Sequence, residues 1–210
     1  MFLLVGLGNP GSRYERTRHN VGFDVVALLA QRLSAPLRDP RFGALLGTGR
    51  LNAEQVILAM PQTWMNRSGD SVGPMAGFYR VPPTQVVVVH DELDLPFGDI
   101  RLKSGGGHGG HNGLRDVSAK LGTGEYPRVR FGIGRPEGPM DPADWVLSRW
   151  TEEQRQALPA LLERAADAVS SVVADGIQAA MNRWNGPLPG KSGAGSTGRG
   201  ESALPRKERN

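Results

Sequence analysis

Apolar residues along the chain follow two repeating patterns, and their alternation predicts the fold. Short apolar runs predict strands at residues 2–6, 44–48, 55–60, 86–89, 99–103 and 128–134. Apolar positions at helical spacing predict helices over residues 21–33, 72–79, 114–121 and 151–172. Because these strands and helices alternate, we predict a single α/β domain with a mixed, mostly parallel, twisted sheet and helices on both faces.

Three short stretches sharpen this prediction. The continuous β-branched run Val86–Val89 is typical of a central strand that is covered on both faces. Asn20 precedes the helix that begins near Val21, at a position where asparagine is a preferred cap. Thr151 and Gln154 have the spacing of a capping box, which is predicted to open the long C-terminal helix.

Composition excludes several kinds of protein. The 210 residues include no cysteine, so the chain has no disulfide, no thiolate metal ligand and no thiol nucleophile. No apolar run is long enough to span a bilayer, and the first residues make a poor signal peptide. We therefore predict a cytoplasmic protein.

The net charge of +4 is unevenly distributed along the chain. Residues 186–210 hold five basic and two acidic side chains, which leaves a net charge of only +1 for residues 1–185. Glycine, serine and proline dominate the same segment, which predicts a folded domain at 1–185 and a disordered basic tail at 186–210. A nucleic acid would therefore bind the domain through a local basic patch, with help from the tail.

Polar clusters follow two of the predicted strands, and a third cluster is rich in glycine. Asn9 follows the first strand, Asp91 follows the valine run, and Gly105–Gly113 leads into a helix. Ligands of open α/β sheets bind beyond the carboxyl ends of the strands. If the first strand and the valine run are neighbours, Asn9, His19 and Asp91 converge there.

A histidine beside a carboxylate has a chemical use. The carboxylate fixes the imidazole tautomer and stabilises the imidazolium that forms when the ring takes a proton from water. The helix that follows His19 disfavours its protonated form, whereas Asp91 favours it, and the balance suits a general base near pH 7. Asn9, Asn66 and Asn112 would supply neutral groups that position a carbonyl or an oxyanion.

Four polar or glycine-rich segments follow one another along the chain: Gly6–Gly22, Thr63–Gly69, His90–Pro96 and Gly105–Gly113. Taken in this order and at this spacing, they resemble the motifs of the bacterial-type peptidyl-tRNA hydrolases. The similarity runs from Phe2 to about Trp184. That family hydrolyses the ester between a peptide and the 3′ end of tRNA, which frees stalled or dropped-off translation products, and it uses no metal or organic cofactor. The resemblance therefore implies a monomeric esterase that acts on peptidyl-tRNA, with its catalytic domain at 1–185.

The resemblance also implies a role for each matching residue. His19 is expected to be the general base and Asp91 its partner. Asn9 would help to distinguish a peptidyl group from a free aminoacyl group, and His111 would support the water or the peptide. The terminal nucleotide and the peptide would meet Tyr14, Trp64, Asn66 and Asn112. A clamp on tRNA phosphate would consist of Lys103 and Arg130, and a mobile lid would span Asp141–Trp150. Trp64 stands where the family more often has Phe or Tyr.

Structural alternatives remain for these residues. His19 could pack at a helix start, and Asp91 could belong to a turn. Asn66 and Asn112 could be helix caps. The two clamp residues could be ordinary solvated charges, and both aromatic residues could be core or surface groups. His90 is interpreted as structural, and the division of work between His19 and His111 stays open.

Three rival functions also remain. Gly6, Gly8 and Gly11 match a dinucleotide-binding fingerprint, but Pro10 and a polar loop stand where that motif needs a helix. A metal could bind His90, Asp91, His108 and His111, although this spacing fits no metal site that we can name. RNA binding without catalysis is the third rival, and the presence of both the base and its partner argues against it.

Overall fold

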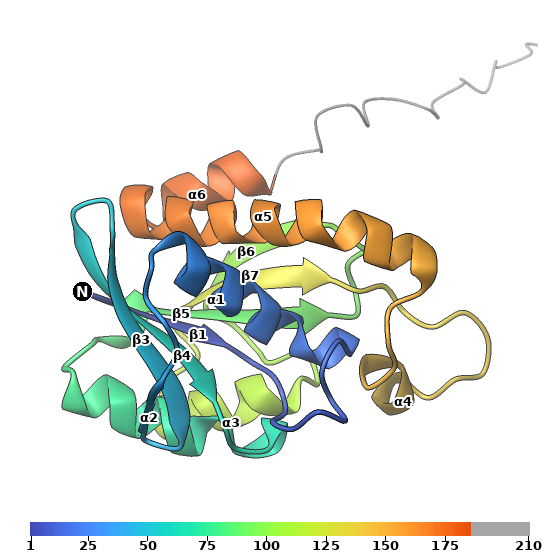
Figure 1. Ribbon diagram of the computed structural model, residues 1–210, viewed down its shortest axis with the longest axis horizontal. Helices are drawn as coiled ribbons and strands as arrows, with labels where there is room; N and C mark the ends of the chain where they lie inside the picture. Colours follow the sequence, from blue (N-terminus) through green and yellow to red (C-terminus); the bar gives the residue numbers. More distant parts are fainter. Residues whose placement is uncertain (186–210) are drawn as a thin grey trace, which may run out of the picture.

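The computed structural model describes residues 1–185, which form a seven-stranded sheet between two layers of helices (Figure 1). The strand order is β2-β3-β4-β1-β5-β7-β6. The four central strands β4, β1, β5 and β7 run parallel, while β2–β3, β3–β4 and β6–β7 pair antiparallel. The strands are β1 (Phe2–Gly6), β2 (Asp39–Arg41), β3 (Ala44–Leu51), β4 (Glu54–Pro61), β5 (Val86–Glu92), β6 (Ile100–Ser104) and β7 (Pro127–Gly132).

The helices divide between the two faces of the sheet, as Figure 1 shows. One face carries α1 (Val21–Arg32), α5 (Glu152–Asp175) and α6 (Ile177–Trp184). The other face carries α2 (Gly69–Phe78) and α3 (Asn112–Leu121). Beyond one end of the sheet lies α4 (Pro142–Val146), and short 3-10 turns occur at η1 (Arg18–Asn20), η2 (Met65–Arg67) and η3 (Pro83–Gln85).

The valine run shows why the sheet is central to the fold. Val87 and Val89 pack in the core beneath α1 and α5, whereas Val86 and Val88 pack in the core beneath α2 and α3. All four side chains are fully buried. The prediction of a central strand covered on both faces is therefore confirmed, and so is the α/β fold class.

Most sequence-based element predictions are confirmed, with some differences at their ends. The hairpin strands β3 and β4 are longer than predicted, and the short strand β2 was not predicted at all. The capping box of Thr151 and Gln154 is present at the start of α5. Gly176, whose φ is 80°, ends α5 and separates it from α6, which the apolar pattern did not predict.

A close approach of two backbones places the candidate site. The parallel register of β1 and β5 sets Gly6 beside Val89. A Cβ atom on Gly22, in the first turn of α1, would lie 2.4 Å from the carbonyl oxygen of Val89. Only glycine allows this contact, which brings the turn before α1 directly onto the carboxyl end of β5.

Two further predictions concern membranes and the C-terminal segment. None of the helices among residues 1–185 is long and apolar enough to cross a membrane. The tail predicted at residues 186–210 lies outside the described residues. The division into a domain at 1–185 and a tail therefore stays a prediction.

Candidate active site

A cleft of about 620 Å³ opens beyond the carboxyl ends of β1 and β5. Strand ends, the turns η1 and η2, the glycine-rich loop and α4 all contribute to its wall. Its polar side chains include most of the predicted site residues: Asn9, His19, Asn66, Asp91, His111 and Asn112. The carboxyl ends of neighbouring strands thus gather residues that are far apart in the sequence, as the prediction required.

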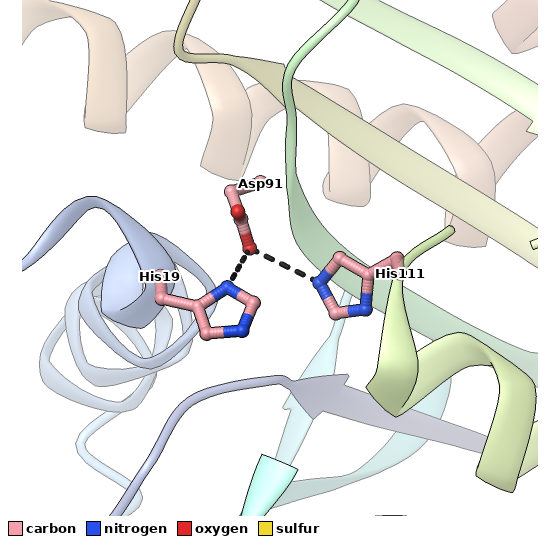
Figure 2. Close-up of side chains that lie close together, drawn as sticks. All are labelled: His19, Asp91 and His111. Atoms are coloured by element: carbon pink, nitrogen blue, oxygen red, sulfur yellow. Dashed lines mark hydrogen bonds and ion pairs between the residues drawn. The ribbon is translucent and has the colours of Figure 1, made fainter. Parts of the chain in front are cut away.

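Two histidines share one carboxylate oxygen in this cleft (Figure 2). His19 Nδ1 lies 2.8 Å from Asp91 Oδ1, and His111 Nε2 lies 3.1 Å from the same atom. The Asp91 side chain is only 2% exposed, while that of His19 is 12% exposed and borders the cleft. The predicted convergence of His19 with Asp91 is therefore present, and His111 joins them.

Burial and charge act in opposite directions on this group. Burial alone raises the pKa of Asp91, but the charges and hydrogen bonds of His19 and His111 outweigh it and hold the pKa well below its usual range. Burial lowers the pKa of His19, whereas the charge and the hydrogen bond of Asp91 raise it. The two effects of Asp91 together exceed that of burial, so the pKa of His19 is above the ordinary histidine value. Asp91 is therefore ionised and accepts a hydrogen bond from His19 Nδ1. This leaves His19 Nε2 without a proton and available to a group in the cleft.

Asn9 is held by hydrogen bonds at its backbone amide, at its backbone carbonyl and at its side-chain oxygen. Its Oδ1 accepts from the Met65 amide at 2.8 Å, so its Nδ2 donor is left for the cleft. Its own amide donates to Asn20 Oδ1, and Asn20 Nδ2 donates back to the Asn9 carbonyl. Asn20 stands at the N-cap position of α1, as predicted, but its side chain makes no capping hydrogen bond, because it is used by this pair.

The glycine-rich loop delivers two side chains at the start of α3. His111 is the N-cap, because its Nδ1 accepts from the Leu114 amide at 3.3 Å. Asn112 is the first residue of the helix and lies exposed in the cleft. The capping alternative for Asn112 is therefore wrong. Asn66, in η2, is likewise exposed and lines the cleft.

The two aromatic residues meet at the edge of the cleft. The rings of Tyr14 and Trp64 lie edge to face, with centroids 5.8 Å apart. Trp64 is 54% exposed and lines the cleft, whereas Tyr14 contacts the ring of Trp64 and is not part of the lining. A large ring this exposed and supported by a neighbour is suited to contact a ligand rather than the core.

A second pocket of about 350 Å³ adjoins the cleft and contains both predicted clamp residues, Lys103 and Arg130. Arg130 Nε lies 3.0 Å from Glu92 Oε2, and Glu92 lines both pockets. Arg128, in the same pocket, is buried and donates to the carbonyls of Gly106 and Gly107. Arg128 therefore supports the glycine-rich loop, while Arg130 is half-buried in an ion pair.

Sequence reasoning missed Arg18, the neighbour of His19. Its side chain is 1% exposed, and its guanidinium lies 3.7 Å from the ring centroid of Trp145 in α4. It also donates to Ser148 Oγ and Gln154 Oε1. Arg18 therefore ties the turn that carries His19 to α4, which lines the cleft. Arginine is usually exposed, so the sequence held no signal for this role.

Comparison with known proteins agrees with the resemblance in the motifs. A model of the peptidyl-tRNA hydrolase family matches residues 3–192. The chain belongs to that family. It is 55% identical to a peptidyl-tRNA hydrolase of Mycobacterium marinum and 54% identical to one of Nocardia farcinica, each over 182 residues. These alignments cover 86% of this chain and 95% and 94% of the two relatives.

Solved structures give the same result for the fold. The crystal structure of peptidyl-tRNA hydrolase from Acinetobacter baumannii superimposes with a TM-score of 0.82 at 41% identity. The match covers 88% of this chain and 94% of that one. The family and the fold expected from the sequence are thus both confirmed.

The metal alternative can be compared with the actual grouping of side chains. Among residues 1–185, the ligand atoms of His19, Asp91 and His111 lie within 4.8 Å of one another. His90 and His108 are not part of this group: His90 Nδ1 donates to the Asp91 carbonyl, and His108 Nδ1 accepts from the Gly110 amide. The atoms that would face an ion are already joined by two hydrogen bonds. The absence of a metal stays a prediction that chelation can test.

Proposed function

We propose that the chain hydrolyses the ester between the peptide and the 3′-terminal ribose of peptidyl-tRNA, which releases free tRNA and peptide. The observation that carries this proposal is the His19–Asp91 pair at 2.8 Å in the main cleft of a chain from this family. The partner is thus a nucleic acid, and no organic or metal cofactor is required. We also predict a cytoplasmic monomer.

His19 acts as the general base in this mechanism. Its Nδ1 proton is held by Asp91, so Nε2 takes a proton from water as the water oxygen attacks the ester carbonyl carbon. Asp91 stabilises the resulting imidazolium. The tetrahedral intermediate then expels the ribose oxygen, which receives the proton back from His19. The products are a free ribose hydroxyl and a peptide carboxylic acid, which loses its proton to the solvent and becomes a carboxylate.

Asn9 provides a physical basis for selecting a peptidyl group. Because its Oδ1 is used by the Met65 amide, its side chain offers only the Nδ2 donor. A peptidyl group presents a carbonyl oxygen that can accept from this donor, whereas the ammonium of a free aminoacyl group is itself a donor. Asn66 and Asn112 supply further donors for the peptide carbonyls and for the oxyanion.

The tRNA end is held by groups around the cleft. Trp64, supported by Tyr14, stacks on the terminal base, as aromatic side chains do on single-stranded RNA ends. Lys103 and Arg130 bind backbone phosphate in the adjoining pocket. The basic segment 186–210 adds affinity for RNA that does not depend on sequence.

Release of free tRNA from N-acetyl-aminoacyl-tRNA, in the presence of a chelator, tests the proposed activity. Unblocked aminoacyl-tRNA is the matched control substrate. We expect cleavage of the blocked substrate only. Failure of the folded protein to cleave it would favour the rival function, RNA binding without catalysis. Loss of cleavage in chelator that zinc restores would favour the metal alternative.

A further inference from the structure

Asp91 has one more imidazole partner than a general-base mechanism needs. The second partner, His111, is held by three contacts. Its Nδ1 accepts from the Leu114 amide, its Nε2 lies 3.1 Å from Asp91 Oδ1, and its ring packs edge to face against that of His90, with centroids 5.0 Å apart. Figure 2 shows the rings of His19 and His111 on either side of the carboxylate.

These contacts fix the tautomer of His111. A backbone amide can only donate, so His111 Nδ1 carries no proton. The ionised carboxylate of Asp91 can only accept, so His111 Nε2 carries the ring proton. Both ring nitrogens of His111 are therefore occupied while the ring is neutral, whereas His19 keeps Nε2 free of such contacts within the described part of the chain.

We propose that His111 is a positioning residue for the hydrolysis: it holds the Asp91 carboxylate for His19 and weakens its attraction for the His19 proton, and it accepts no proton itself. This inference rests on the proposed role of His19 as the base. It specifies how the work is divided between His19 and His111, which the sequence alone left open. Taking up a proton would also break the His111 cap on α3, because Nδ1 would no longer accept.

The groups around His111 support this role. Asp91 and His90 face it from β5, and His19 faces it from η1, with ring centroids 5.1 Å apart. His90 is buried, donates to the Asp91 carbonyl and is neutral, because burial lowers its pKa to about 3. Glu92, His108 and Asp141 also line the cleft but form no ion pair with these residues among positions 1–185.

The proposal predicts the direction in which the pKa of His19 changes when the His111 hydrogen-bond donor is lost. A hydrogen bond donated to a carboxylate disperses its charge and makes it a weaker partner for another cation. Loss of the His111 donor would therefore leave more of the Asp91 charge to His19 and raise the basicity of His19. The acid limb of the pH–rate profile, where His19 must lose its proton, would then move to higher pH.

The variant His111→Asn separates capping from the contact with Asp91. Asparagine is a good helix cap, so α3 keeps its N-cap, but the donor to Asp91 is removed. We expect kcat to fall about tenfold, as loss of one hydrogen bond to a charged group allows, KM to change less, and the acid limb to rise by roughly half a pH unit. His108→Asn, in the same loop, is the matched control and should leave the acid limb in place. An acid limb that stays or moves to lower pH in His111→Asn would overturn the proposal.

A spectroscopic measurement tests the same proposal without relying on a variant. Ring-nitrogen NMR of the unaltered full chain at neutral pH should show His111 protonated at Nε2 and unprotonated at Nδ1. A proton on Nδ1 would refute it. This result is independent of turnover. Failure of the proposed function would instead appear as an unaltered protein that cleaves no blocked substrate.

Discussion

The two adjoining pockets of this molecule are built in opposite ways. In the cleft, the carboxylate of Asp91 is almost fully buried and is held by two imidazoles at 2.8 Å and 3.1 Å. In the second pocket, Arg130 is 26% exposed and is held by a single ion pair with Glu92. A fixed, buried pair suits proton transfer, which depends on geometry, whereas exposed charges suit phosphate binding, which depends on ionic strength.

Replacing His19, the proposed base in the cleft, should have the largest effect. His19→Ala is expected to lower kcat by at least roughly 10²-fold, because general-base catalysis contributes about 10²–10⁴-fold. Binding of tRNA, measured by filter retention at low salt, should change little, because His19 lies outside the second pocket. A variant that turns over within a few-fold of the unaltered chain would remove His19 from this role.

Replacing a proposed phosphate contact in the second pocket should have a smaller effect, on KM rather than on kcat. Lys103→Ala and Arg130→Ala are each expected to raise KM about five- to tenfold at low salt and to flatten its dependence on salt. Their kcat should stay nearly constant. The matched control is Arg50→Ala, which removes one exposed charge from the hairpin of β3 and β4. Equal salt slopes in all three variants would count against the clamp.

The smallest expected effect concerns the residue that lines both pockets. Glu92 pairs with Arg130, so its carboxylate competes with a phosphate for that guanidinium. Glu92→Gln should therefore lower KM by roughly two- to fivefold, because a partly exposed ion pair contributes about 0.2–1 kcal/mol. Steady-state kinetics at several salt concentrations would measure this. Weaker binding in the variant would indicate that Glu92 instead orients Arg130 for the phosphate.

The sequence predicts the parts of this molecule that depend on local pattern. Strands, the main helices and the capping box at Thr151 follow from apolar spacing and cap chemistry, and they are confirmed. The convergence of His19 with Asp91 also followed, once β1 and β5 were taken as neighbours. Nothing in the apolar pattern indicated β2, since Asp39–Arg41 contains no apolar run.

What the sequence did not predict depends on contacts between distant segments. Arg18 is buried because it meets residues about 130 positions away, beside α4. Asn20 looked like a cap, but its partner is the backbone of Asn9. His111 was expected to support the water or the peptide, and the sequence held no sign that both of its ring nitrogens are used, by the Leu114 amide and by Asp91.

The pH dependence of kcat/KM for Asp91→Asn, measured beside the unaltered chain, tests the central claim most directly. Asp91 raises the pKa of His19 and burial lowers it, so removal of the charge should lower that pKa. Because only neutral His19 can act as a base, the acid limb should move to lower pH. The plateau should fall about ten- to hundredfold, as loss of a hydrogen bond to a charged group allows. A plateau that falls with an unmoved acid limb, or a limb that moves to higher pH, would contradict the pairing of His19 with Asp91 as the catalytic base.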